Sequence, residues 1–266
     1  MVTRFASGLS LEYLVTGRGE PVTVFAHGLA GSIAETRPLG SGVAGRRVFF
    51  QFRGHGRSDP PPGSTDYADL AADLRAIADH FGATRALGAS LGAGALLRLL
   101  EQTPDRFDRI VAYLPAVLDE PRPPSAAVRS RDLLAAVLAG DRPTAEALLA
   151  ERVPAESTEA RRVLAEQLDW LLDGGLAPGL GELPGLAAVT DAPALAAVTA
   201  RALVVGCRGD DAHPVSVAES LAAVLPLSIL HVYAEPAVLW TARADLRERI
   251  AGFLNAGSAG VGSGDG

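Results

Sequence analysis

Gly88-Ala89-Ser90-Leu91-Gly92 is the stretch that decides the fold of this 266-residue chain. It has the pattern G-x-S-x-G and lies between an apolar run, residues 84–87, and a helical run, residues 91–100. In this strand-turn-helix setting the flanking glycines let the backbone turn sharply and lift the serine side chain above the end of a sheet. The pattern therefore makes Ser90 a candidate nucleophile.

The segments around this stretch predict an α/β fold. Short β-branched or aromatic runs alternate with helical patterns, which is typical of a mostly parallel central sheet with helices on both faces. Further strands are expected at residues 22–26, 47–52, 109–114, 202–206 and 228–233. Apolar residues at intervals of three and four predict a helix with one apolar face along Tyr67, Leu70, Leu74, Ile77 and Phe81. A closing helix is expected at residues 244–254.

The alternation of strands and helices stops between residues 115 and 200. Ala, Leu, Arg and Glu form helical runs there. We therefore predict a core of residues 1–114 and 201–254 with an inserted helical cap, residues 115–200. The part of the cap at residues 174–193 is rich in Gly, Pro and Leu and is expected to be irregular and mobile. The Gly/Ser-rich tail, residues 255–266, is expected to be disordered and without a role in chemistry.

Composition limits the partners. The chain is 48% hydrophobic, enough to bury a full core. Its 31 acidic against 24 basic residues, with no basic cluster, argue against a nucleic-acid or anionic-membrane partner. A single cysteine, Cys207, excludes an internal disulfide, and no apolar run is long enough for a signal peptide or a membrane span. We expect a cytoplasmic location by default and a small-molecule substrate, and the oligomeric state stays open.

Two further motifs precede the serine pattern. They are Ala26-His27-Gly28-Leu29 and Arg53-Gly54-His55-Gly56-Arg57-Ser58. In this order the three motifs resemble the oxyanion turn, the loop after the third strand and the nucleophile elbow of the α/β-hydrolase fold family. The resemblance covers residues 25–100, weakens through the cap and returns at residues 203–225 and near residues 244–254. Gln51 departs from it, because the family usually has aspartate before the arginine-glycine loop.

The resemblance implies a serine hydrolase that carries out acyl transfer. A serine hydroxyl is a weak nucleophile at neutral pH, so it needs a base within hydrogen-bond reach and donors for the tetrahedral oxyanion. The family supplies those donors from the backbone N–H groups that correspond to Leu29 and Leu91. Because the nucleophile position carries serine, the family branches that attack with aspartate are excluded.

The resemblance places the catalytic acid in the loop after the first strand beyond the cap. The family's aspartate stands four residues before a proline that opens a helix, which selects Asp210 over Asp211 before Pro214. The alternative is that both aspartates belong to a solvated turn and are helix N-terminal charges, which the helix macrodipole favours.

The histidine of the family's relay is absent from its usual place. Family members carry Gly-His in the loop after the last strand, where this chain has Pro236, and no histidine follows His231. Proline cannot accept or donate a side-chain proton, so that loop cannot supply the base. His213, three residues after Asp210, is the best candidate for a relocated base. The alternative is that His213 has a structural or substrate-contacting role at a helix start.

The other histidines have simpler explanations. His231 is expected to be packed in the last strand or at a sheet edge. His27 is expected to hold the oxyanion turn by a side-chain hydrogen bond. His55 and His80 are expected to lie remote from the site.

The substrate and the activity are less constrained. We expect substrate contacts at His27, Gly28 and Trp240 and apolar walls that suit a small, largely apolar ester, thioester or related acyl compound. The expected walls are Leu29, Leu91, Trp240 and the cap residues Leu168, Trp170 and Leu171, although the cap residues are also explained as cap core. No metal or cofactor motif is present, so neither is expected. Two hypotheses remain open, an esterase-like serine hydrolase and a catalytically silent protein that uses the pocket to bind a ligand.

Overall fold

The computed structural model describes residues 1–5, 8–151 and 153–257, and it is built on one eight-stranded sheet. The strand order is β1-β2-β4-β3-β5-β6-β7-β8. The six strands β3 to β8 run parallel to one another. Strands β1 and β2 form an antiparallel extension at the β4 edge. The bounds are β1 Val2–Arg4, β2 Ser10–Thr16, β3 Val22–Ala26, β4 Arg46–Phe50, β5 Arg85–Ala89, β6 Arg109–Tyr113, β7 Arg201–Cys207 and β8 Ser228–Tyr233.

Helices cover both faces of the sheet and create two apolar cores. On one face pack α2 (Tyr67–Phe81), α3 (Leu91–Gln102) and α7 (Val215–Val224). On the other face lie α1 (Ile33–Thr36) and α9 (Arg243–Asn255), with the short α8 (Val238–Thr241) before α9. The central strands β3 and β5 are buried along their whole length, because helices exclude water from both of their faces. The predicted mostly parallel α/β fold is confirmed.

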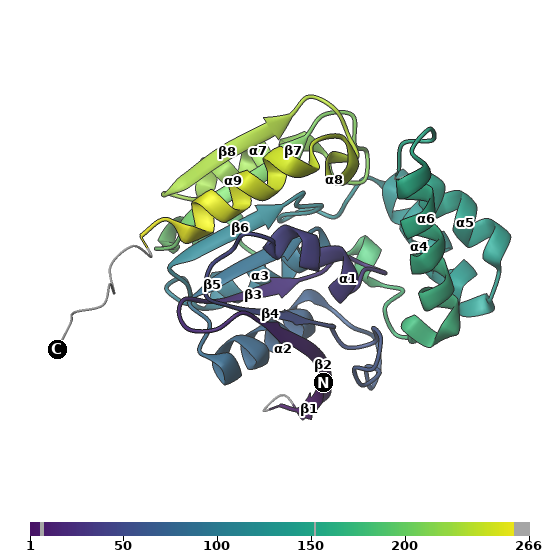
Figure 1. Cartoon of the computed structure of the whole chain (residues 1–266), viewed down its shortest axis with the longest axis horizontal. Coiled ribbons are helices and arrows are strands. Elements are labelled where there is room, and N and C mark those ends of the chain that lie inside the picture. Colours follow the sequence, from purple (N-terminus) through teal and green to yellow (C-terminus); the bar gives the residue numbers. More distant parts are fainter. Residues whose placement is uncertain (6–7, 152, 258–266) are drawn as a thin grey trace.

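The predicted cap segment contains three long helices. These are α4 (Pro124–Ala139), α5 (Arg142–Ala150) and α6 (Thr158–Trp170). Figure 1 shows them in teal and green as a separate layer to the right of the sheet. A π-helical turn (Leu171–Gly175) and two 3₁₀ turns (Leu183–Gly185 and Ala192–Ala197) then lead back to β7. The boundaries of the cap, residues 115–200, stay a prediction.

The segment expected to be irregular has no long helix or strand, but its first part is held to the core by backbone hydrogen bonds. The Ala177 N–H donates to Gly54 O at 2.8 Å, and the Gly56 N–H donates to Gly175 O at 3.0 Å. These bonds join the loop after β4 to the chain that leaves α6.

The structure also extends the sequence prediction. Sequence patterns did not indicate β1 and β2, and they placed the end of β4 two residues too late. The end of the tail, residues 258–266, lies outside the described residues. Among the helices of the described residues, none is both long and apolar enough to cross a membrane.

Candidate active site

Ser90 lies at the sharp turn between β5 and α3. Its φ of 50° and ψ of −107° fall outside the regions that L-residues favour, so the turn is strained as predicted. The flanking glycines permit this geometry. A Cβ on Gly88 would lie 2.3 Å from Gly92 O, and a Cβ on Gly92 would lie 2.4 Å from Ala26 O. No larger residue fits at either position without moving backbone.

His213 lies between Ser90 and Asp210. Its Nε2 is 2.8 Å from Ser90 Oγ, and its Nδ1 is 2.8 Å from Asp210 Oδ2. An ionised carboxylate only accepts hydrogen bonds, so Nδ1 of His213 is the donor in the contact with Asp210. Nε2 is then left as an acceptor for the Ser90 hydroxyl. The structure thus brings together the three residues that the sequence analysis named, with the geometry of a nucleophile, a base and an orienting acid.

Local hydrogen bonds hold Asp210 in place. Its Oδ1 accepts the backbone N–H groups of Ala212 at 2.9 Å and His213 at 3.1 Å, and the Cys207 thiol approaches Oδ2 at 3.9 Å. Burial alone would raise the pKa of Asp210, but the bonds from His213 and Ala212 outweigh burial and lower it. The same carboxylate and burial raise the pKa of Cys207 to about 12, so the thiol stays protonated. Asp211 is exposed, as expected.

The turn after β3 leaves one amide available beside Ser90. The Gly28 N–H donates to Glu35 Oε2 at 3.2 Å, and the Ala30 N–H donates to His55 Nε2 at 3.3 Å. Between them, the Leu29 N–H has no hydrogen-bond partner among the described residues. Leu91 is the first residue of α3, so its N–H also has no partner within the helix. These are the two amides that the sequence analysis expected to form an oxyanion hole.

Two histidines in edge-to-face contact join the turn after β3 to the loop after β4. His27 faces Gly28 O through Nδ1 at 2.7 Å and accepts the Phe52 N–H on Nε2 at 3.1 Å. The His55 ring lies 4.7 Å from the His27 ring, and its Nδ1 donates to Arg53 O at 3.1 Å. The expected loop-holding bond of His27 is therefore present. The expectation that His55 is remote is wrong, because His55 contacts the turn directly through Ala30.

The same contacts change the expectation that His27 touches the substrate. His27 and His55 are both fully buried, and backbone groups occupy both ring nitrogens of each. Burial lowers the pKa of His27 well below its usual value, and the neighbouring His55 adds to the effect. Burial also lowers the pKa of His55 to about 4. Both rings are neutral at pH 7 and act as supports.

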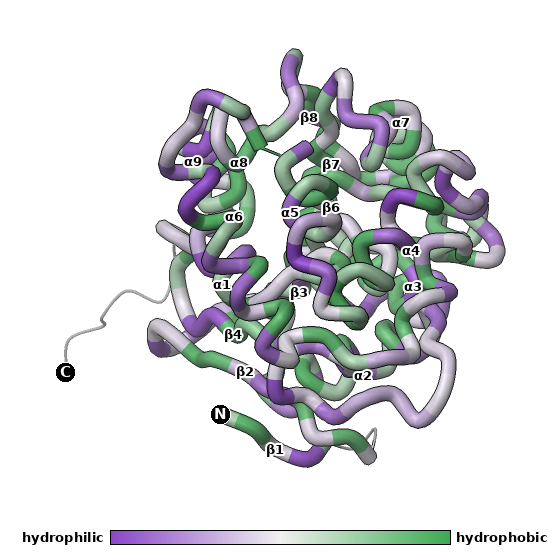
Figure 2. The backbone as a smooth tube through the Cα atoms, turned by 90° about the vertical axis from the view of Figure 1, so that its right-hand side faces the viewer, coloured by the Kyte–Doolittle hydropathy of each residue, from purple (hydrophilic) through white to green (hydrophobic). Residues whose placement is uncertain are grey.

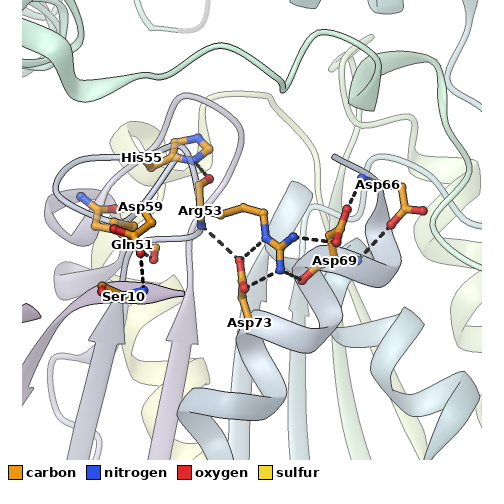
Figure 3. Close-up of polar contacts among 9 residues, drawn as sticks. Ser10, Gln51, Arg53, His55, Asp59, Asp66, Asp69 and Asp73 are labelled. Carbon is orange, nitrogen blue, oxygen red and sulfur yellow. Dashed lines mark hydrogen bonds and ion pairs between the residues drawn. The ribbon is translucent and has the colours of Figure 1, made fainter. Parts of the chain in front are cut away.

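An arginine anchors the loop that carries His55. The guanidinium of Arg53 donates to both carboxylate oxygens of Asp73 at 2.8 and 2.9 Å and to Asp69 Oδ1 at 2.6 Å. Figure 3 shows these bonds from Arg53 to α2, together with the bond from His55 to the Arg53 carbonyl. Asp73 is fully buried, so loss of Arg53 would leave an uncompensated charge. The position of His55 thus depends on α2.

The remaining predicted residues lie at the margins of this arrangement. Pro236 packs beside Gly209 in the loop that carries Asp210, where the Pro236 Cδ is 3.7 Å from the Cβ position of Gly209. His231 lies on the edge strand β8 and its ring is 4.5 Å from the ring of Tyr233, in agreement with the prediction. Trp240 is half-buried on α8 under the guanidinium of Arg243. His80 is exposed at the end of α2.

Two residues at the site were not found from the sequence. The Glu35 carboxylate holds the Gly28 amide, and the Cβ position of Gly28 is 3.3 Å from Glu35 Oε1 and 3.5 Å from Ser90 Cβ. From α6, Gln167 donates to Ala30 O at 2.9 Å. No motif marks either residue. Their roles depend on the short helix α1 and on α6, which contact the turn after β3.

Comparison with known proteins agrees with the fold. The family described as alpha/beta hydrolase fold matches residues 21–177, which is more than half of the chain. The chain belongs to the α/β-hydrolase family. A 2-(acetamidomethylene)succinate hydrolase from Mesorhizobium japonicum is 32% identical over 178 residues, and this similarity spans 64% of the chain and 62% of the relative.

Solved structures support the family assignment at the level of the fold. A hydrolase from Pseudomonas aeruginosa superposes with a TM-score of 0.74 at 22% identity and covers 96% of this chain and 98% of its own. An enol-lactonase from Burkholderia xenovorans superposes with a TM-score of 0.76 at 18% identity and covers 96% of this chain and 100% of its own. The relatives with stated activities are hydrolases.

Proposed function

We propose that the chain is a serine hydrolase in which Ser90 attacks an acyl group, His213 is the base and Asp210 orients the base. The observation that carries the proposal is the 2.8 Å separation of His213 Nε2 and Ser90 Oγ, continued by the 2.8 Å contact of His213 with Asp210. A ligand-binding protein without activity has no need for this chain of contacts. The geometry therefore favours the enzyme over the silent binding module.

The proposed reaction has two halves. As Ser90 Oγ attacks the acyl carbonyl carbon, its proton passes to His213 Nε2, and the developing oxyanion accepts the N–H groups of Leu29 and Leu91. Asp210 stabilises the imidazolium that forms. His213 then gives the proton to the leaving group, and a water molecule activated by the same ring hydrolyses the acyl-enzyme and restores the serine.

The proposed substrate is a small ester, thioester or related acyl compound. Support comes from the relative that is 32% identical to this chain, which is named a 2-(acetamidomethylene)succinate hydrolase. The proposed cap, residues 115–200, restricts size, since Gln167 and Glu159 tie α6 to the turn after β3 and to α9. Gly28 and Trp240 remain proposed substrate contacts. The proposed pocket walls remain Leu29, Leu91, Trp240, Leu168, Trp170 and Leu171.

A fluorophosphonate probe and ester kinetics test the proposal. The probe is expected to label the wild type and not Ser90→Ala, because it reacts with an activated serine. His213→Ala is expected to lower kcat by a factor on the order of 10³ or more, as loss of a triad member does in other hydrolases. His231→Ala is the matched control and is expected to retain turnover. Equal labelling of the wild type and Ser90→Ala, or full activity of His213→Ala, contradicts the mechanism.

A further inference from the structure

Strand β8 forms one rim of the sheet. Within the described residues it pairs only with β7, and Figures 1 and 2 both show it at the end of the sheet opposite β1. Its outward edge is six residues long and contains no proline, lysine or bulge. Proteins usually block a free edge with such features, because unpaired backbone groups are a template for another strand.

Apolar side chains gather at this edge. Leu227 is 50% exposed, Ile229 59% and Leu230 38%, and no other four consecutive described residues carry three exposed large apolar side chains. Successive residues of a strand point to opposite faces, so Ile229 and Leu230 leave apolar surface on both sides of β8. Leu227 and Ile229 also line a hollow of about 400 Å³ together with Arg109, Arg201 and Phe253.

The charges around β8 favour a second copy of the chain as the occupant. Arg109 and Arg201 lie by the beginning of the strand, in the same hollow as Leu227. Acidic groups lie by its end, where Glu235 follows the strand and Asp245 accepts a hydrogen bond from Tyr233. Arg249 pairs with Asp245, and Arg208 donates its backbone N–H to Tyr233 O, so the acidic character of this end depends on Glu235. An antiparallel arrangement of two β8 strands brings the basic end of each next to the acidic end of the other.

We propose that the chain forms a two-fold symmetric dimer in which the β8 strands pair antiparallel and join the two sheets into one. In such a pair, directly opposite residues have their side chains on the same side of the sheet. The two-fold axis must therefore pass at the level of one residue, which pairs with its own copy, and not between two residues. The six-residue strand pairs most fully when the axis passes through Leu230 or through His231. Ile229 then lies opposite His231 of the second copy in the first register and opposite Tyr233 in the second. In either register, pairing of the two strands covers apolar side chains on both faces of β8.

Disulfide trapping tests the dimer and its register. In Leu230→Cys or His231→Cys, the residue on the axis meets its own copy at the spacing of a cross-strand pair, which suits a disulfide. The native Cys207 is buried and gives little background. We expect one of the two variants to form a covalent dimer under mild oxidation by copper phenanthroline. Leu138→Cys on α4 is the control, since Leu138 is 47% exposed and lies far from β8 in the sequence.

Analytical ultracentrifugation from micromolar to submillimolar protein gives the second measurement. Ile229→Lys places a charged side chain in the apolar part of the interface in either register and is expected to raise the dimer dissociation constant at least tenfold. Leu138→Lys is expected to leave it unchanged. Circular dichroism shows whether each variant is folded. A wild type that stays monomeric over this range overturns the proposal, as does a dimer that Ile229→Lys leaves intact or that neither cysteine traps.

Discussion

Acid should destabilise this protein through His55. The ring is fully buried, and its pKa falls from 6.5 in an unfolded chain to about 4 in the folded protein. As the pH falls below about 6.5, His55 binds a proton in the unfolded chain, whereas in the folded chain it stays neutral until about pH 4. The stability is therefore complete above pH 6.5 and is lost as the pH falls toward 4. A difference of about 2.5 units corresponds to about 3 kcal/mol, at roughly 1.4 kcal/mol for each unit.

The matching substitution is His55→Gln. The glutamine amide has both an acceptor for the Ala30 N–H and a donor for Arg53 O, which His55 contacts at 3.3 and 3.1 Å, but it cannot take up a proton near neutral pH. His80→Gln is the control, because His80 is exposed at the end of α2. Neither change affects the carboxylates that also contribute to acid unfolding.

Urea unfolding between pH 7 and pH 4.5 measures the effect. In this range the free energy of unfolding of the wild type should fall more steeply with acid than that of His55→Gln. At the lower end of the range the difference between the two slopes should correspond to the uptake of close to one proton on unfolding. His27 has a pKa shift in the same direction, so a slope of about one further proton should persist in the variant. His80→Gln should follow the wild type. Equal slopes for the wild type and His55→Gln would refute the inference that a neutral His55 ring supports the turn.

Three further predictions concern turnover. Glu35→Ala should lower kcat about tenfold, because the Gly28 amide loses its acceptor and the neighbouring Leu29 amide is aimed less well, whereas Glu35→Gln should retain most of the activity in the same ester assay. Pro236→His should not raise ester turnover, because His213 already contacts Ser90, and a gain would mean that the relay is incomplete as it stands. Turnover should survive dialysis against a chelator, since no group of three or more metal-binding side chains occurs in the described part of the chain, and loss of activity would contradict a pure serine mechanism.

The fold was predictable because its strongest signals are local. The glycine-flanked serine, the buried strands and the periodic face of α2 each depend on a few neighbouring residues, and all appear where expected. The extension by β1 and β2 was missed for a related reason. Strand β2 buries Leu11 and Tyr13 in alternation, but β1 has only three residues, which is too short for a pattern to mark it.

The site was predictable only in part, because several roles depend on contacts between distant segments. Asp210 and His213 could be named as candidates because they share one loop, whereas the contact of His213 with Ser90 crosses 123 positions. The role of His55 was misjudged because it depends on Arg53, which Asp73 holds from α2 twenty positions later. Spacing along the chain does not reveal that the loop after β4 folds back onto the turn after β3.

The placement of His213 has a physical basis in the loop that carries it. Asp210 accepts two backbone amides of its own turn, which orients the carboxylate before it meets the ring, and His213 then needs only the local geometry of that turn to present Nε2 to Ser90. A histidine on the loop after β8 would instead have to be positioned by a separate segment. In this chain that loop contributes Pro236, which packs against Gly209, a residue with a φ of +72°. The proline therefore lies beside the loop that carries both the proposed base and the proposed acid, and we propose that His213 carries out the proton transfer.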